Sequence, residues 1–319
     1  MNLRRTIAAL ATSLLAAGAI AGCGKDDESA ETGPPNGTVV VAGTPYAPSP
    51  ELRKLIDGAA RGANAALTQR DPATDAAAQA RQLKPLLEAS SGLKSVVVGA
   101  FDPAATETLI AARGSGGPAV ISLLTPLTGA STTLTLDAEA VSGRLARAAG
   151  AWASSHAVDA ATVLMPPEAP VADWSAGFGR TVAKQLVDDL SEEGLAVTAL
   201  EATGTADAKA ALGFDPGRLV IGWNDATALG AAQAITAKGT TSRWVGAAGS
   251  PTPSSADALT ALSDGRLNLI VGTRLQDLAS LIVATAADPP STKTRALPVR
   301  SFSRSSAVTS AAVADFSGG

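Results

Sequence analysis

The sequence has almost none of the side chains on which disulfides and metal sites depend. It contains one cysteine, so no disulfide can form within the chain, and one histidine, so a metal-binding cluster of cysteines and histidines is excluded. It also lacks a Gly-x-Ser-x-Gly nucleophile motif and a glycine-rich phosphate loop with lysine. These absences predict a protein that is not an enzyme and carries no cofactor. A hydrolase that uses only carboxylates stays open, because 29 residues are acidic.

Aromatic residues and positive charge are also scarce. Aromatic residues make up 3% of the chain, so any core must be built from alanine, valine, leucine and isoleucine. The formal net charge is −4, whereas a nucleic-acid-binding protein presents a basic face to phosphates. We therefore exclude nucleic acid as a partner. With 319 residues, the chain is long enough to bury one large core or two of moderate size.

The first 23 residues have the pattern of an export signal. Arg4 and Arg5 are followed by an apolar run over 7–20, which is short for a membrane-spanning helix. The run ends in Ile-Ala-Gly-Cys at 20–23, which resembles the bacterial lipobox. The resemblance implies cleavage before Cys23, a diacylglycerol on its sulfur, and stable anchoring by more than one acyl chain. The alternatives are an ordinary signal peptide and a buried apolar helix.

This signal sets the expected location of the protein. We expect residues 1–22 to be a lipoprotein signal peptide and residues 23–37 to be a polar, flexible tether without core-forming residues. The folded body would then stand on the extracytoplasmic face of a cell membrane, which it contacts through the lipid anchor.

From residue 38 onward, short apolar runs alternate with alanine-rich helical stretches. The runs are nearly continuous in apolar residues, as expected of parallel strands that helices cover on both faces. Strands are predicted over 38–42, 95–99, 119–123, 161–165, 196–200, 218–222, 243–246 and 268–272, with a shortened edge strand at 66–70. Helices are predicted over 50–67, 74–90, 104–113, 137–155, 174–193, 226–238 and 275–286. This alternation predicts a doubly wound α/β architecture, and the length favours two lobes.

Several segments, in the right order, resemble the type 1 periplasmic solute-binding proteins, which are receptors for ABC importers. They are a strand followed by Asp-Pro and a helix at 95–105, Gly-Phe at 177–178, Trp-Asn-Asp-Ala-Thr-Ala-Leu-Gly at 223–230 and Asp-Gly-Arg-Leu at 264–267. The resemblance implies two doubly wound, Rossmann-like lobes joined by a hinge, one of 38–136 plus 273–291 and the other of 137–272 plus 292–319. A small sugar-like or amino-acid-like ligand would lie between the lobes, and an ABC permease would receive it.

Five residues are candidates for ligand contact under this resemblance: Asn224, Trp223, Trp174, Tyr46 and Arg274. The Asn224 amide can donate and accept hydrogen bonds, although it could instead cap the following helix. Trp223 and Trp174 lie at loop-to-helix junctions, where a ring could stack on a ligand or pack within a lobe. Tyr46 is either a ligand-contacting aromatic or a surface residue. Arg274 could pair with a ligand carboxylate or hydroxyl, or be solvated.

The acids that bind ligand in related receptors are missing here. Sugar receptors usually carry an Asp-Arg pair where residues 123–126 read Leu-Leu-Thr-Pro, and an acid where residues 247–249 read Ala-Ala-Gly. The stretch 121–126 has some resemblance to branched-chain amino-acid receptors, yet the acid for a ligand amine is again missing at Ala248. This departure motivates an alternative function, a transport-inactive lipoprotein of the same fold that serves as a sensor or scaffold for an envelope partner.

Overall fold

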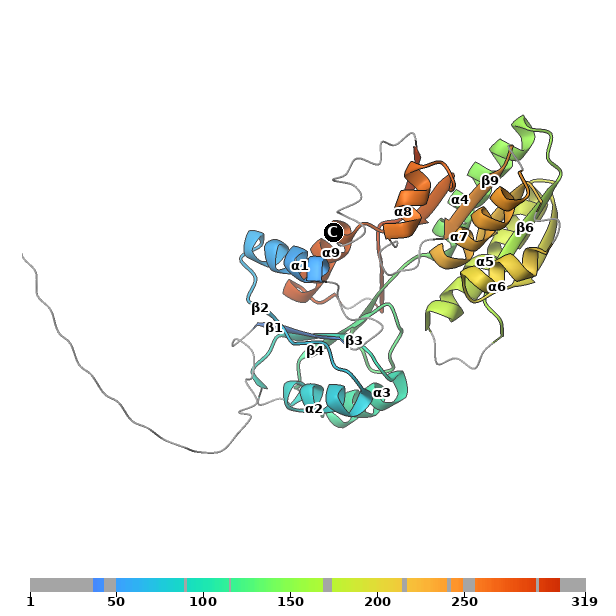
Figure 1. Cartoon of the computed structure of the whole chain (residues 1–319). Coiled ribbons are helices and arrows are strands. Elements are labelled where there is room, and N and C mark those ends of the chain that lie inside the picture. The colour runs from blue at the N-terminus through green and yellow to red at the C-terminus, as the bar shows by residue number, and fades with distance from the viewer. Residues whose placement is uncertain are drawn as a thin grey trace, which may run out of the picture. The chain divides into compact units, whose positions relative to one another are not determined.

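The computed structural model describes two mostly parallel β-sheets of six strands each, with helices on both faces of each sheet (Figure 1). The described residues are 37–42, 50–88, 91–114, 116–168, 174–213, 217–239, 242–248, 256–290 and 293–304. The predicted signal peptide, Cys23, most of the predicted tether and Tyr46 lie outside them.

The first sheet has the strand order β11-β5-β4-β3-β1-β2, and its pairings are all parallel. Helices α1 and α9 cover one face, and α2 and α3 cover the other (Figure 1). The valines of β1 and β3 are buried whichever face they point to, as expected of central parallel strands. The elements are β1 (Thr38–Ala42), β2 (Leu67–Gln69), β3 (Ser95–Gly99), β4 (Ala119–Leu123), β5 (Thr132–Thr135), β11 (Thr294–Ala296), α1 (Pro50–Gly62), α2 (Ala76–Leu87), α3 (Pro103–Ala112) and α9 (Leu275–Ala287).

Helix α9 comes from late in the chain, and polar groups fasten its carboxyl end to the first sheet. Ser95 Oγ donates to the carbonyl oxygen of Ala286 (3.1 Å), and Lys94 Nζ donates to that of Ala287. The last carbonyl groups of a helix have no partner within it, so these bonds satisfy acceptors that would otherwise need water. They also fix α9 against β3, far away in sequence.

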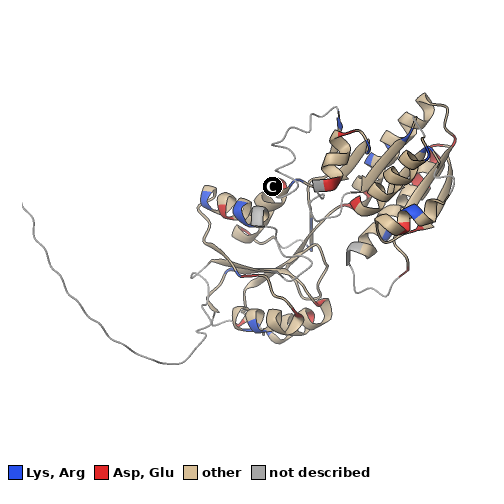
Figure 2. Ribbon diagram, in the orientation of Figure 1, with Lys and Arg blue, Asp and Glu red and all other residues tan. Residues whose placement is uncertain are grey.

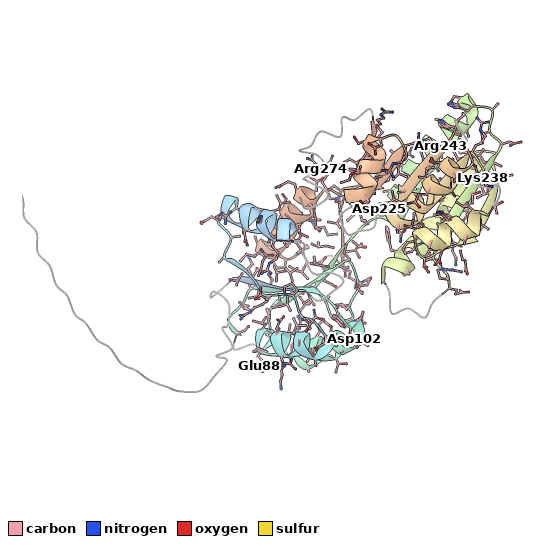
Figure 3. All side chains as sticks on the ribbon, viewed as in Figure 1. Glu88, Asp102, Asp225, Lys238, Arg243 and Arg274 are labelled. Atoms are coloured by element: carbon pink, nitrogen blue, oxygen red, sulfur yellow. The ribbon has the colours of Figure 1, made fainter. Side chains whose placement is uncertain are left out.

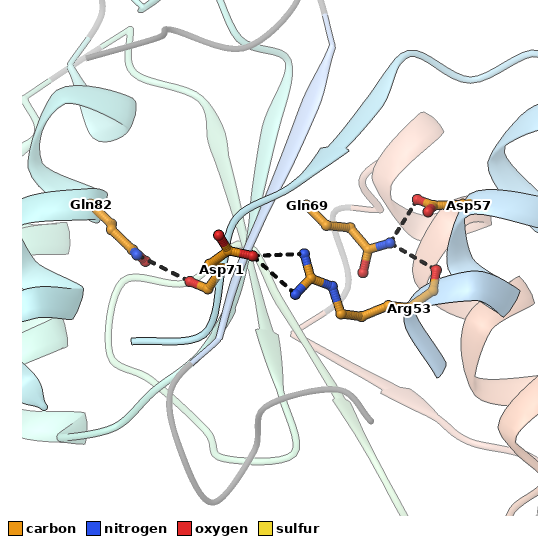
Figure 4. A network of polar contacts seen from close by, with 5 residues as sticks. All are labelled: Arg53, Asp57, Gln69, Asp71 and Gln82. Carbon is orange, nitrogen blue, oxygen red and sulfur yellow. Dashed lines mark hydrogen bonds and ion pairs between the residues drawn. The ribbon is translucent and has the colours of Figure 1, made fainter. Parts of the chain in front are cut away.

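The short edge strand β2 is held by a polar network between α1 and α2 (Figure 4). Gln69 Nε2 donates to the Arg53 carbonyl oxygen (2.8 Å) and to Asp57 Oδ1 (2.7 Å). Arg53 pairs with Asp71 (3.2 Å), and Gln82 Nε2 donates to the Asp71 carbonyl oxygen (3.1 Å). An edge strand has backbone hydrogen bonds to a neighbouring strand on one side only. The side-chain hydrogen bonds therefore help to hold β2, a strand of only three residues, in place.

The second sheet has the order β12-β10-β9-β8-β6-β7 and is parallel except for the antiparallel pair β10–β12. Helices α4 and α5 pack on one face, and α6, α7 and α8 pack on the other. Charged residues lie chiefly on the helices and loops, whereas the strands are almost free of them (Figure 2). The elements are β6 (Ala160–Met165), β7 (Ala196–Glu201), β8 (Leu219–Gly222), β9 (Trp244–Ala248), β10 (Leu269–Gly272), β12 (Arg300–Ser303), α4 (Ala138–Ser155), α5 (Trp174–Glu192), α6 (Thr205–Leu212), α7 (Asp225–Ala237) and α8 (Ala256–Ser263).

The predicted two-lobed, doubly wound fold is confirmed, and every predicted strand and helix is present with ends shifted by a few residues. The prediction missed β5, β11, β12, α6 and α8. It was also wrong to place all of 292–319 in the second lobe, because β11 pairs with β5 in the first sheet and only then does the chain enter β12. Both late strands are short and polar, so they carry no apolar pattern that sequence could detect.

Candidate functional site

Each sheet contains a point at which the direction of strand addition reverses. In the first sheet β2 and β3 lie on opposite sides of β1, and in the second β7 and β8 lie on opposite sides of β6. Open α/β sheets bind ligands outside the carboxyl ends of their strands at such a switch point. The candidate site therefore consists of the residues that follow β1 and β3 in one sheet and β6 and β8 in the other.

Asn224 lies at the second switch point, just after β8, and is the N-cap of α7. Its Oδ1 accepts the backbone N–H of Thr227 (2.8 Å), and the Thr227 hydroxyl accepts the backbone N–H of Asn224 (3.3 Å), which completes a capping box. The structure thus shows the capping role that was the alternative to ligand contact. Capping uses the amide oxygen, while Nδ2 has no hydrogen-bond partner among the described residues.

Asp225, the next residue, is buried in the first turn of α7, and Figure 3 shows it at the start of that helix. A negative charge there interacts favourably with the positive end of the helix dipole. Asp225 therefore has a structural reason to be acidic.

Trp223 is half-buried and anchored by its polar atoms. Its backbone N–H donates to the Leu164 carbonyl oxygen (3.2 Å), and Nε1 donates to that of Ala202 (2.8 Å). The ring lies against α5 at Gly179, where an added Cβ would meet Cε3 at 2.3 Å. The indole therefore packs within its own lobe, and any ligand contact would use its exposed ring surface.

Arg274 follows β10 and Thr273 and is the N-cap residue of α9, without a capping bond from its side chain. It is half-buried. Close by, Arg300 Nε donates to Asp277 Oδ2 (2.9 Å) in the first turn of α9. This hydrogen bond, together with the charge attraction to Asp277, raises the pKa of Arg300 above its ordinary value.

The two other candidates are placed less fully. Trp174 is the first residue of α5, the helix that follows β6 in the chain. It therefore follows one of the strands that define the second switch point. Tyr46 lies in the segment after β1, outside the described residues. Both therefore stay predictions as ligand contacts.

The described residues at the ends of β4 and β9 carry no acid. After β4, Leu124 has φ +67°, which is uncommon for a leucine, and the Ser122 hydroxyl donates to the Thr125 carbonyl oxygen. Thr125 Oγ1 and Thr273 Oγ1, which follow β4 and β10, are buried and have no hydrogen-bond partner among the described residues. A buried hydroxyl therefore follows β4, where related receptors were expected to have an Asp-Arg pair, and a second follows β10.

Sequence reasoning missed Arg180, which lies beside the carboxyl ends of β6 and β7. Its Nη1 donates to the Pro166 carbonyl oxygen (2.8 Å), and the guanidinium pairs with Glu201 (3.5 Å) and Glu168 (3.8 Å). The one sequence signal was its position two residues after the Gly-Phe at 177–178. Arg180 links the segment after β6 to the edge strand and so supports the second switch point.

Comparison with solved structures identifies the fold. Similar structures include a periplasmic ribose ABC transporter protein from Conexibacter woesei (TM-score 0.69, 14% identity, 89% of this chain and 99% of that one). Another is a Mycobacterium smegmatis protein in complex with β-D-fucofuranose (TM-score 0.62, 19% identity, 85% and 92% covered). The chain has the type 1 periplasmic binding protein fold.

A third protein of the type 1 fold extends the comparison. It is the binding component of the arabinose ABC transporter of Shewanella, solved with L-arabinofuranose (TM-score 0.63, 14% identity, 86% and 94% covered). No family model and no curated protein matches the chain. At sequence identities of 14–19%, the similarity to these three proteins shows a shared fold and nothing more.

Proposed function

We propose that this chain is a lipid-anchored extracytoplasmic solute-binding protein that captures a small polar ligand between its two lobes and delivers it to an ABC importer. The observation that carries the proposal is a fold similarity that spans 85–89% of this chain and 92–99% of the three similar proteins, two of which are ABC transporter proteins. Because the similar structures named above include two sugar complexes and a ribose transporter protein, we propose a sugar as the ligand, ahead of an amino acid.

Within this proposal, the second switch point supplies specific groups to the ligand. Asn224 Nδ2 would donate to a hydroxyl, because the amide oxygen is already held by the cap of α7. Trp223 would offer its exposed ring surface from a fixed position. Arg274, Trp174 and Tyr46 would complete the contacts from the loops after β10, β6 and β1.

We also propose that a lipid on Cys23 holds the protein at the membrane. The support is the lipobox-like Ile-Ala-Gly-Cys at 20–23 behind a short apolar run. Within the described part of the chain, no helix combines the length and the apolar composition needed to cross a membrane.

A thermal-shift screen of the purified full chain against sugars, amino acids and nucleosides tests the proposal. A ligand at 100 times its dissociation constant should stabilise the protein by about 2.7 kcal/mol, which is a readily measured rise in Tm. We expect a rise with at least one sugar. The absence of any shift across the panel would reject solute capture.

The second candidate function is a sensor or scaffold for an envelope partner. The observation in its favour is the lack of acids at the ends of β4 and β9 among the described residues. It predicts that no small solute stabilises the chain and that a protein partner is recovered by cross-linking in membranes. Sugar binding by the purified chain would count against it.

A further inference from the structure

Phe101 is the one large hydrophobic side chain of the described residues that is exposed, with 36% of its surface accessible. It follows β3 and the fully buried Ala100. A single exposed apolar residue needs no explanation by itself. What distinguishes Phe101 is how firmly the structure holds the backbone that carries it.

A buried glutamine holds the backbone in front of Phe101. Gln79, on α2, is only 2% exposed. Its Nε2 donates to the Gly99 carbonyl oxygen (2.8 Å), and its Oε1 accepts the backbone N–H of Phe101 (2.7 Å). Both the Nε2 and the Oε1 of this buried amide therefore form hydrogen bonds with the backbone of the segment that carries the Phe101 ring. Since an unpaired buried amide is costly, the segment has little freedom to move away from α2.

The backbone behind Phe101 is fixed as well. Asp102, shown at the start of α3 in Figure 3, caps that helix, because its Oδ1 accepts the N–H of Ala105 (3.1 Å). The Thr106 hydroxyl donates to the Asp102 carbonyl oxygen (2.8 Å), and Pro103 opens the helix. Phe101 is therefore an exposed aromatic ring on a preorganised turn.

The position of this turn indicates what the ring is for. β3 lies next to β1, so Phe101 follows one of the two strands that define the switch point of the first sheet. Ligand sites of this kind combine aromatic and apolar surface with a few fixed polar groups. An aromatic ring offers a flat face to apolar C–H groups. The hydroxyl-bearing ring of a sugar has such a face, whereas an open-chain polyol has none that is fixed.

We propose that Phe101 contacts the ligand by stacking on the apolar face of a cyclic sugar, and that Gln79 is a positioning residue that fixes its ring at the switch point. The proposal rests on the proposed function, since it names the class of ligand for that same site. It selects cyclic sugars over the open-chain alditols that form when those sugars are reduced.

Calorimetric titration of the full chain tests this with three sugars, D-ribose, L-arabinose and D-galactose, each paired with its reduced open-chain alditol. We expect the wild type to bind at least one sugar more tightly than its alditol. Phe101→Ala should raise the Kd for that sugar about tenfold or more, the size expected when a contacting aromatic is truncated. Phe101→Tyr should keep most of the affinity. Thr108→Ala, an exposed change on α3, the helix that follows Phe101, should leave Kd unchanged.

Gln79→Met tests the positioning role separately. It removes both hydrogen bonds while nearly keeping the side-chain volume, and we expect it to lower the preference for the sugar over its alditol. A loss of stability alone would not change that ratio. If the wild type binds a sugar and Phe101→Ala binds it equally well, or if the alditol binds as tightly as the sugar, the inference is wrong while the proposed function stands. If none of the three sugars binds the wild type, the inference is rejected, and the thermal-shift panel decides the proposed function separately.

Discussion

Gly179 and Gly177 lie two residues apart on α5 and should respond oppositely to the same substitution. A Cβ at Gly179 would lie 2.3 Å from Cε3 of Trp223, against an ordinary contact of at least 3.4 Å, so the ring must move by about 1 Å. That movement strains or breaks the hydrogen bond from Nε1 to the Ala202 carbonyl oxygen. Gly177 is exposed and has no atom within 4 Å of the added carbon.

The size of the difference follows from three contributions. Overpacking a buried contact costs about 1–3 kcal/mol, and the lost indole hydrogen bond costs about 1 kcal/mol. Alanine in place of glycine inside a helix regains up to about 1 kcal/mol. Gly179→Ala should therefore lower the free energy of unfolding by about 1–3 kcal/mol, whereas Gly177→Ala should raise it by up to about 1 kcal/mol.

Urea unfolding of both variants, followed by tryptophan fluorescence, measures the pair directly. Gly179→Ala should also shift the emission of the native protein to longer wavelength, because the indole becomes more exposed. Equal stability of the two variants would refute the packing of Trp223 against α5, and with it the idea that the ring is fixed at the second switch point.

Three further predictions concern other parts of the chain. Asn224→Ala should lower the free energy of unfolding by about 1 kcal/mol, because it removes the helix cap. Asn224→Asp keeps the capping oxygen, so it should lower the affinity for the ligand without lowering the melting temperature. Equal ligand affinity of Asn224→Asp and the wild type would exclude Nδ2 as a ligand donor. Cys23→Ser should move the protein from the membrane pellet to the soluble fraction, and unchanged pelleting would exclude the lipid anchor. Gly230→Ala places Cβ 2.4 Å from the Thr205 carbonyl oxygen and should lower the free energy of unfolding by about 1–3 kcal/mol. Gly143→Ala is the control and should not lower it, because the nearest atom to its Cβ is a guanidinium nitrogen of Arg147 at 3.7 Å. Equal melting temperatures of the two variants would contradict the close approach of α6 and α7.

The sequence predicted well the elements whose pattern is carried by neighbouring residues in the chain. The valines of β1 and β3 form apolar runs because helices cover both faces of these strands. Asp102 followed by Pro103 predicted the start of α3 because the capping oxygen and the first helical position are adjacent in the chain. Local chemistry of this kind can be recognised without knowledge of the rest of the fold.

The features that sequence missed depend on partners far away in the chain. Glutamine is a polar residue that usually lies on the exposed face of a helix. Only the packing of α2 near the end of β3 buries Gln79 and lets it hydrogen-bond the backbone of Gly99 and Phe101. Gly179 gave no sign that it faces Trp223, which is 44 positions later. The strand β12 reads Arg-Ser-Phe-Ser and becomes a strand only because β10 is available to pair with it.

Native mass spectrometry of the full chain, released gently from membranes, tests solute capture most directly. We predict one sugar-sized adduct per chain, either carried through purification or acquired after addition of the three sugars. A spectrum that shows the unliganded mass alone, before and after their addition, would contradict the assignment of this chain as a sugar-binding receptor.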